Sequence, residues 1–479
     1  MSFETIIGLE IHAELKTKTK IFCNCSTKFG SEPNENTCPV CLGMPGTLPV
    51  LNEEVVRLAS KAGTALNSTI NKLNKMDRKN YFYPDLPKAY QISQFDLPIC
   101  SGGYIDINSN GEVKRINLNR IHIEEDAGKL VHVEYEPYTL IDYNRVGVPL
   151  IEIVTEPDLR SIDDAVSFLK NLKEILEYAD ISDCRMEQGS LRCDANISLR
   201  EVGSNKLNTR VEIKNLNSFK ELQKALEKEE KRQRELYTYG EEHKIVQETR
   251  RWDSAKGKTV SMRSKEESHD YRYFPEPDVI PIVIKDEIIE GVIKDIPELP
   301  KEKRVRFTQV YKLGEKEVEI LVGDKSLSMY YEELIEKGSD AKIACNWVLS
   351  DILRVINEKK ITIDDFSIRP DRMHRLLTFV ESGKINNTAA KEVFEEMLTS
   401  HKVPEDLIKE KGLLQTNSID DIRPIVEEVL KQNSKVVEEY KGGKTQVKGF
   451  LVGMIVKATE KKANPKVINE ILEEILNNI

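Results

Sequence analysis

The chain has 479 residues, of which 39% are hydrophobic and 32% are charged, and its formal net charge at pH 7 is −10. This length exceeds what one compact core supports, so we expect two to four domains. No apolar run approaches the roughly 20 residues that a membrane helix requires, which excludes a membrane-spanning protein. The composition predicts a water-soluble chain without a membrane partner.

The first segment, MSFETIIGLEIHAEL, alternates apolar with polar residues and carries an acidic residue close to its start. The alternation predicts a β-strand, whereas a secretory signal peptide begins basic and continues apolar. We therefore expect a cytoplasmic protein. Because successive side chains of a strand point to opposite faces, Glu10, His12 and Glu14 share its polar face.

Four cysteines follow this strand closely: Cys23, Cys25, Cys38 and Cys41. In a reducing cell such a cluster favours metal binding over disulfides. Four cysteines close the tetrahedron of a structural zinc site, whereas a catalytic zinc keeps three protein ligands and an open position. We expect a zinc knuckle at 23–41 that pins the end of the first strand. A zinc hydrolase or deaminase is the rival interpretation, and the H-x-E partner that a deaminase shows is missing.

A second alternating segment, INLNRIHIEEDAGKL, ends in an acidic run. Parity groups Glu124 with His122 and leaves Glu125 on the side of Ile123. Because the end of this strand is not defined by the sequence, either glutamate could join the other acids.

Two further segments, SLRCDANISL and RVEIKN, repeat the pattern and are joined by a plausible hairpin loop. The polar face of the first segment carries Arg192 and Asp194, and that of the second carries Glu212. Asp194 and Glu212 could therefore face each other across the pair of strands. Carboxylates and a histidine interleaved with cations suit Mg²⁺ and the phosphates of a nucleotide. Ordinary solvent-exposed positions are the alternative. The two GKT triplets lack the earlier glycine of a phosphate-binding loop.

The remaining pattern is helical. Ser161 and Ser218 open two predicted helices of the N-terminal part, the second with Glu221 in capping-box spacing. After about residue 295 strands become rare. The predicted fold class is therefore α+β, with an N-terminal antiparallel-sheet domain with helices (1–294), a helical domain (295–405) and a small helical tail domain (406–479).

The tail is locally basic although the whole chain is acidic. Seven lysines and one acidic residue, Glu460, lie between Lys441 and Lys466, next to the flexible pair Gly442 and Gly443. A local positive field can bind a polyanion such as RNA. A solvated lysine-rich helix is the alternative.

Several longer stretches, among them IGLEIHAEL, DRKNYFYPDLPKAYQISQ, DYNRVGVPLIEIVTEPD, MEQGSLRCDANISLR and GFLVGMIVKAT, closely resemble the B-subunit family of the aspartyl/glutamyl-tRNA(Asn/Gln) amidotransferase, over essentially the whole chain. The resemblance implies a carbon–nitrogen ligase that uses glutamine as amido donor. Its B subunit would bind tRNA(Gln) or tRNA(Asn), phosphorylate the misattached glutamate or aspartate side chain with ATP and Mg²⁺, and let ammonia displace the phosphate. It also implies a heterotrimer with a glutaminase A subunit and a small C subunit.

The resemblance also assigns residues. A metal and catalytic site in a cradle-like N-terminal domain would contain Glu10, His12, Glu125 or its neighbour Glu124, Asp194 and Glu212, and the resemblance favours Glu125. Lys79 and Arg192 are expected to contact phosphate or substrate. Tyr81, Phe82 and Tyr83 could stack on the terminal adenosine of tRNA or pack under a loop. The tRNA body would be held by Lys441, Lys444, Lys448 and Lys457. A non-catalytic tRNA-binding scaffold remains the alternative function.

Overall fold

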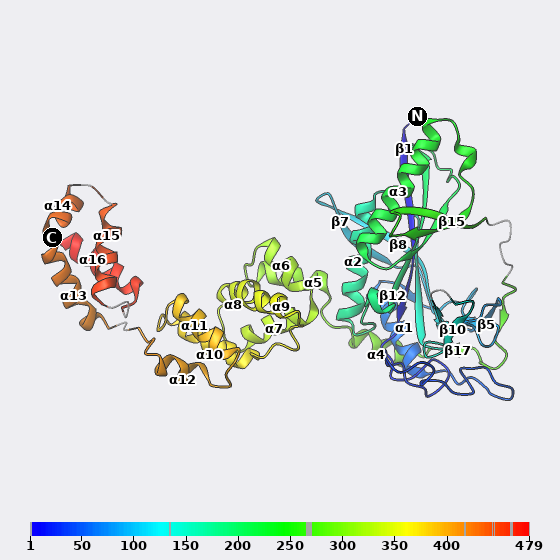
Figure 1. Ribbon diagram of the computed structural model, residues 1–479, viewed down its shortest axis with the longest axis horizontal. Coiled ribbons are helices and arrows are strands. Elements are labelled where there is room, and N and C mark those ends of the chain that lie inside the picture. The colour runs from blue at the N-terminus through cyan, green and yellow to red at the C-terminus, as the bar shows by residue number, and fades with distance from the viewer. Residues whose placement is uncertain are drawn as a thin grey trace. The chain divides into compact units, whose positions relative to one another are not determined.

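A computed structural model of the chain describes residues 2–133, 136–264, 271–415, 418–442, 444, 446–459 and 463–478. The chain divides into two units, residues 1–300 and 301–479 (Figure 1). The first contains the sheets and the second is helical, which confirms the predicted α+β class. Among the described residues, no helix combines the length and the apolar character needed to cross a bilayer.

The first unit is built around one large sheet with β1 (Phe3–Glu14) at its middle. Its described neighbours on one side are, in order, β12 (Leu191–Glu201), β13 (Val211–Leu216), β14 (Glu248–Asp253) and β15 (Lys258–Ser264). On the other side lie β11 (Pro149–Thr155), β8 (Glu112–Glu125), β6 (Cys100–Ser101) and β2 (Thr69–Ile70), and β7 (Tyr104–Ser109) also pairs with β8. β13 and β14 run parallel, and the other described pairs of this sheet are antiparallel.

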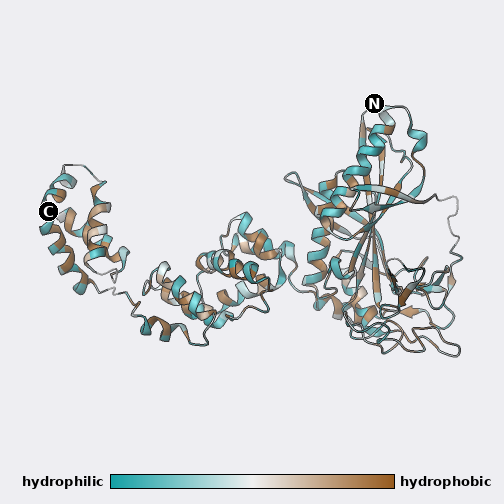
Figure 2. Cartoon of the chain, viewed as in Figure 1, coloured by the Kyte–Doolittle hydropathy of each residue, from teal (hydrophilic) through white to brown (hydrophobic). Residues whose placement is uncertain are grey.

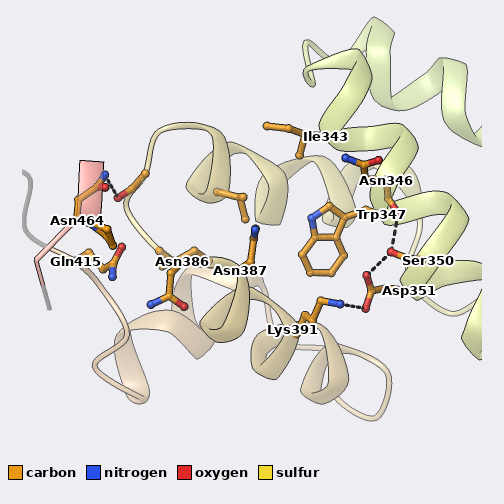
Figure 3. A pocket seen from close by; sticks show the side chains of 14 residues that line it. Ile343, Asn346, Trp347, Ser350, Asp351, Asn386, Asn387, Lys391, Gln415 and Asn464 are labelled. Carbon is orange, nitrogen blue, oxygen red and sulfur yellow. Dashed lines mark hydrogen bonds and ion pairs between the residues drawn. The ribbon is translucent and has the colours of Figure 1, made fainter. Parts of the chain in front are cut away.

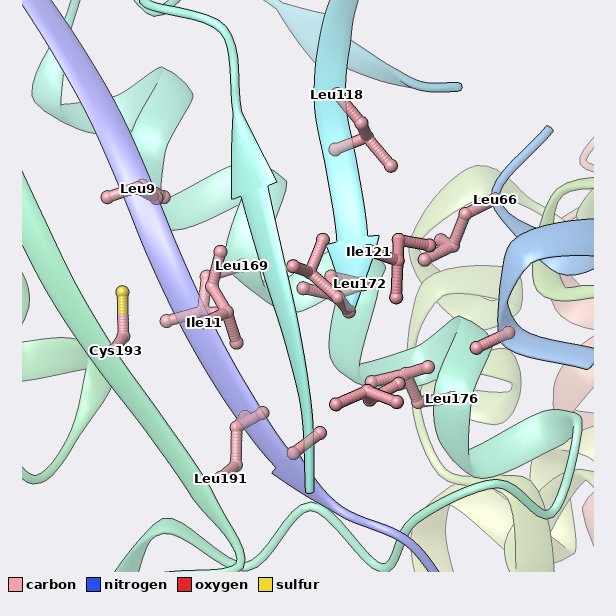
Figure 4. Close-up of a cluster of buried hydrophobic side chains, with 14 of the residues drawn as sticks. Leu9, Ile11, Leu66, Leu118, Ile121, Leu169, Leu172, Leu176, Leu191 and Cys193 are labelled. Atoms are coloured by element: carbon pink, nitrogen blue, oxygen red, sulfur yellow. The ribbon is translucent and has the colours of Figure 1, made fainter. Parts of the chain in front are cut away.

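One face of the sheet is apolar and packs on helices. In β1, Ile7, Leu9 and Ile11 are buried, and Figure 4 shows Ile11 beside Leu169 and Leu172 of α2 (Ile162–Tyr178). Each such buried side chain contributes about 1.5–3 kcal/mol. Because parity sends the apolar residues to this face, the polar residues of the same strands are left on the opposite face.

Two helices of this unit begin at the serine caps that the sequence predicts. The Ser161 hydroxyl accepts a hydrogen bond from the backbone N–H of Asp164 at the start of α2, and Ser218 accepts one from Glu221 at the start of α3 (Phe219–Thr238). The Glu221 carboxylate accepts from Asn217 N–H, one residue before the cap. Figure 2 shows α3 as largely hydrophilic. The other helices among the described residues of this unit are α1 (Glu53–Ala65), α4 (Asp286–Lys294) and the 3₁₀ turns Met186–Gln188 and Glu242–Lys244.

Three small sheets border the large one. They consist of β4 (Asp77–Asn80), β5 (Tyr90–Ser93) and β16 (Phe274–Pro275), of β9 (Lys129–His132) and β10 (Thr139–Asp142), and of β3 (Leu73–Asn74) and β17 (Ile282–Val283). Arg78 anchors the first of them, because its guanidinium donates to both carboxylate oxygens of the buried Glu276 at 2.6 and 2.8 Å. This pair fixes β4, which carries Lys79, to the segment after residue 270.

The second unit consists of helices. They are α5 (Pro300–Gln309), α6 (Glu315–Val322), α7 (Lys325–Glu336), α8 (Ala341–Trp347), a π-helical turn (Val348–Ile352), α9 (Leu353–Lys359), α10 (Pro370–Glu381), α11 (Asn387–Met397), α12 (Pro404–Glu410), α13 (Ile419–Gln432), α14 (Ser434–Lys441), α15 (Val447–Ala458) and α16 (Pro465–Asn478). Residues of α13 to α16 form a core of their own. The expected boundary between 405 and 406 falls inside α12, whose Leu407 and Ile408 are buried. Since α12 packs on α10 and α11, it belongs with the helices that precede it and not with the tail helices α13 to α16.

Candidate functional site

The polar face of the large sheet aligns ionisable side chains from four neighbouring strands. The register pairs His12 of β1 with Arg192 of β12 and with Glu152 of β11, and it pairs Glu152 with His122 of β8. Strands lie about 4.8 Å apart, so the four side chains form one continuous row. His12 and Arg192 were predicted to lie on this face, whereas Glu152 was not predicted. The alternation of PLIEIVT would have found it, because Ile151 and Ile153 face the core.

His12, Glu124 and Glu152 form a compact cluster. His12 Nε2 lies 3.2 Å from a Glu124 oxygen and 3.4 Å from a Glu152 oxygen, and His122 Nε2 lies 3.0 Å from the same Glu152 oxygen. Burial lowers the pKa of His12, but hydrogen bonds to the two carboxylates outweigh it and raise the pKa to about 10. The imidazolium groups in turn hold the pKa values of Glu124 and Glu152 below their usual range, against the effect of burial.

This cluster has the donor set of a metal site. One atom each of His12, Glu124 and Glu152 lies within 4.8 Å of the others. A histidine ligand must be neutral, so a divalent cation would take the place of the proton that the two carboxylates hold on His12. The carboxylate oxygens suit Mg²⁺, and the imidazole also accepts Mn²⁺ or Zn²⁺. The residues present therefore fit a divalent cation.

Glu124 and Glu125 point to opposite sides of β8. The Glu125 carboxylate accepts two hydrogen bonds from Lys88 Nζ, at 2.5 and 2.7 Å, and one from Ile92 N–H at 2.8 Å. Glu125 is only 2% exposed. The expectation that Glu125 joins His12 is therefore not met, because strand alternation continues to the last residue of β8 and sends Glu124 to the polar face.

Glu10, Asp194 and Glu212 form a second acidic group on the same face. Lys214 Nζ lies 2.6 Å from Asp194 and 3.2 Å from Glu212, and the Asn196 amide donates to Glu10 at 3.0 Å. Burial, together with Glu152 and Glu212, raises the pKa of Glu10. Two carboxylates thus share one ammonium group, and that of Glu10 interacts with it electrostatically, so this region attracts further positive charge.

The register explains how these acids meet. Asn196 of β12, and not Asp194, lies opposite Glu212, in the regular stretch that also pairs Ala195 with Ile213. Lys214 then bridges Asp194 to Glu212 across the two strands. The alternation of RVEIKN predicts the polar face for Lys214 but indicates no role for it.

Lys79 of β4 and Arg192 of β12 both interact electrostatically with Glu124 of the His12 cluster. Burial lowers the pKa of Lys79, but the Glu124 carboxylate outweighs it, and the ammonium lies 4.9 Å from the centre of the Tyr271 ring. Arg192 Nη2 donates to Asp126 at 2.8 Å, while its Nε is buried and has no partner among the described residues. The Lys79 ammonium, which lies against an aromatic ring, and the Arg192 guanidinium, whose Nε–H has no partner in the described part of the chain, are both suited to bind an anionic oxygen of a phosphate.

The three aromatic residues after β4 differ in their surroundings. The ring of Tyr81 packs edge-on against Tyr271, with the ring centres 5.9 Å apart. Phe82 is 89% exposed and Tyr83 is 54% exposed, so neither packs under a loop. These two rings are available to a stacking partner.

Glu14, at the end of β1, makes stability depend on pH. Burial, aided by Asp126 and opposed by Arg192 and Arg145, raises the pKa of Glu14 to about 7 from 4.5. Between these two pH values the folded chain binds more protons than the unfolded chain, so this residue lowers the unfolding free energy as pH rises. We expect Glu14→Gln to gain stability relative to the parent chain between pH 5 and pH 8. Denaturant unfolding of variant and parent at pH 5 and pH 8 measures this. The same difference in unfolding free energy at both pH values would contradict the prediction.

The four clustered cysteines come together, as the sequence predicts. One sulfur each of Cys23, Cys25, Cys38 and Cys41 lies within 4.8 Å of the others, the geometry that a tetrahedral metal ion requires. Hydrogen bonds from Cys23 and from the Cys38 backbone, with the charge of Lys20, lower the pKa of Cys41 to about 5 against the effect of burial.

Lys20 lies directly under this cluster. Its side chain is 0% exposed, and Nζ contacts the carbonyl of Asn36 at 2.7 Å, that of Tyr143 at 3.5 Å and the Cys41 sulfur at 3.7 Å. A buried ammonium requires a nearby negative charge. Thiolates of a metal ion bound at this cluster would provide it, since the other two contacts of Nζ are neutral carbonyls.

The tail lysines have different surroundings. Lys448 forms an ion pair with Glu473, and Lys444 lies 3.3 Å from Glu439. Lys457 is exposed on α15. The side chain of Lys441 and the residue Gly443 lie outside the described part of the chain.

Comparison with known proteins adds two matches of family models and several close relatives. The GatB/GatE catalytic domain matches residues 5–290, and the GatB domain matches residues 329–476. The chain is 63% identical over 476 residues to the second aspartyl/glutamyl-tRNA(Asn/Gln) amidotransferase B subunit of Clostridium acetobutylicum, covering 99% of this chain and 100% of the relative. It is 64% identical over 479 residues to the B subunit of Clostridium beijerinckii, covering 100% of both. The B subunit of Thermoanaerobacter pseudethanolicus is 53% identical over 476 residues, 99% of this chain and 100% of the relative.

Proposed function

Because the chain belongs to the family of B subunits of aspartyl/glutamyl-tRNA(Asn/Gln) amidotransferases, we propose that it activates the side-chain carboxylate of misacylated tRNA with ATP for amidation. The substrates would be Glu-tRNA(Gln), Asp-tRNA(Asn) or both. A carboxylate is a poor acyl donor at neutral pH, and phosphorylation by ATP gives it a leaving group that ammonia can displace.

The cluster of His12, Glu124 and Glu152 is the observation that carries this proposal. These residues would hold a divalent cation, which supplies charge neutralisation for phosphoryl transfer. Lys79 and Arg192 both interact electrostatically with Glu124 of the cluster and would bind the phosphate oxygens.

The acidic group around Lys214 suits the second half of the reaction. Glu10 has a raised pKa and lies with Asp194 and Glu212 on the same face of the sheet. Such carboxylates would bind a further Mg²⁺ of ATP or hold and deprotonate the incoming ammonium. Ammonia itself would come from a glutaminase A subunit, with a small C subunit completing the complex.

The cysteine cluster would hold a structural Zn²⁺, and it follows the strand that carries Glu10 and His12. Four thiolates leave no open coordination position, which supports a structural role rather than the hydrolase or deaminase alternative. The tail, with Lys444, Lys448 and Lys457, would bind the tRNA body.

A non-catalytic tRNA scaffold is the competing function, and ATP turnover separates the two. We expect Asp194→Ala and Glu212→Ala to lower ATP hydrolysis and amide formation at least about 100-fold in the assembled complex with misacylated tRNA. Both variants should bind tRNA as the parent does, since the tail is unchanged. Unaltered ATP turnover in both variants would overturn the catalytic assignment.

A further inference from the structure

The second unit contains a cavity of about 570 Å³ that the proposed chemistry does not use. Its walls come from α8, the π-helical turn, the end of α10 and the start of α11, and Asn464 and Pro465 border it (Figure 3). A cavity of this size admits an aromatic bicyclic group and part of a sugar.

Carboxamides dominate the polar lining of the cavity. Asn346, Asn386, Asn387, Gln415 and Asn464 all line it. Within the described part of the chain, the side chains of Asn346 and Asn387 make no hydrogen bond, and both are exposed to the cavity or to solvent. Each carboxamide offers both a donor and an acceptor, which is the pairing that the edge of a nucleobase requires.

The charges of the cavity cancel. Asp351 accepts a hydrogen bond from the Ser350 hydroxyl at 2.7 Å and pairs with Lys391 Nζ at 3.0 Å. Because this carboxylate is neutralised, the cavity is unsuited to a free metal ion or to a multiply charged anion. A neutral polar ring, with a single phosphate near the exposed Lys391, matches the balance better.

One wall is rigid and aromatic. Trp347 is 5% exposed, and its ring packs against Phe394 with the ring centres 5.6 Å apart. Figure 3 shows the indole facing the same space as Asn387 and Lys391. The π-helical turn Val348–Ile352 begins directly after this residue and interrupts the α-helical hydrogen bonding. Such turns are frequent at functional sites, and Ser350 and Asp351 of this turn line the cavity.

We propose that this cavity binds one unstacked nucleobase from a loop of the RNA substrate, with Asn346 and Asn387 bonding its edge and Lys391 its phosphate. The inference rests on the proposed function, which makes a tRNA the substrate. Proteins recognise RNA sequence mainly through splayed-out loop bases that contact aromatic walls and hydrogen-bonding side chains. The site would therefore read the tRNA body and not the aminoacyl end.

The test uses the assembled complex and unmodified tRNA transcripts. We expect Asn387→Ala and Asn346→Ala each to weaken tRNA binding about tenfold and to raise the KM for misacylated tRNA while kcat stays the same. Chemical probing of bound tRNA should show one loop base protected at its Watson–Crick edge by the parent and exposed in both variants. Asn357→Ala, an exposed asparagine of α9 outside the cavity, is the matched control and should behave as the parent.

Two results would overturn the proposal. One is parent-like binding and protection in both variants, when thermal melting shows them folded and the parent complex amidates tRNA. The other is an equal loss of affinity for tRNA and for an unrelated RNA duplex, which would show a non-specific contact. If the parent complex neither binds nor amidates tRNA, the proposed function fails instead, and the two failures are thereby distinguished.

Discussion

Glu124→Gln should abolish amide formation, with a loss of at least about 100-fold, whereas Glu125→Gln should leave the chemistry of folded protein largely intact. The first change removes a carboxylate from the cluster with His12 and Glu152 and with it a metal ligand. The second change leaves the cluster of His12, Glu124 and Glu152 intact, because Glu125 faces Lys88 on the other side of β8. The measurements are amide formation by the assembled complex and Mn²⁺ binding by titration calorimetry.

Glu125→Gln should instead lower stability. It leaves the Lys88 ammonium buried without its carboxylate, which costs about 3–5 kcal/mol. Combining it with Lys88→Met removes the orphaned charge and should restore part of the loss. Denaturant unfolding measures both variants. If the Glu125→Gln variant loses Mn²⁺ binding but is as stable as the parent, then Glu125, and not Glu124, is the metal ligand.

This pair of residues shows what the sequence can and cannot predict. Strand parity is a local property, so it placed Glu10 and His12 on the polar face from the sequence alone. Parity also grouped Glu124 with His122, but the choice between Glu124 and Glu125 stayed open and the resemblance favoured Glu125. Which strands become neighbours is not local. Glu152 joins the cluster only because β11 is inserted between β1 and β8. The pairing of Asn196, rather than Asp194, with Glu212 depends on the register between β12 and β13.

The burial of Lys20 could not be predicted from the sequence, for a different reason. It is one of several lysines in the stretch KTKTKIFCNC, and nothing in that pattern distinguishes it from its exposed neighbours. Only the folded structure shows that Lys20 is buried next to the cysteines whereas Lys18 is exposed. Spacing thus predicted the thiol cluster, and the charge that balances it became visible only in the folded chain.

Lys20→Met should weaken zinc retention by roughly tenfold to a hundredfold. A zinc ion with four thiolates carries two net negative charges, and the Lys20 ammonium lies 3.7 Å from one of the sulfurs. At an effective dielectric constant of about 20, that attraction is worth about 4 kcal/mol before the cost of burying the ammonium is subtracted. Competition with a coloured chelator measures the retention, and Lys28→Met, an exposed lysine of the same loop, is the matched control.

Stability measurements with and without metal separate this role from simple packing. Methionine fills the space of the lysine but leaves the carbonyls of Asn36 and Tyr143 without their donor, a cost that both forms bear equally. The loss of the counter-charge falls mainly on the zinc-bound form, because zinc holds all four sulfurs as thiolates. Without metal, hydrogen bonding to Cys41 and burial raise the pKa of Cys23, and burial raises the pKa of Cys25, so these two take up protons, whereas Cys41 keeps its charge. We therefore expect Lys20→Met to lower the melting temperature more in the zinc-bound protein than in the chelated protein. Equal losses in both, with parent-like zinc retention, would reduce Lys20 to a packing residue, and the thiolates would then need another source of positive charge.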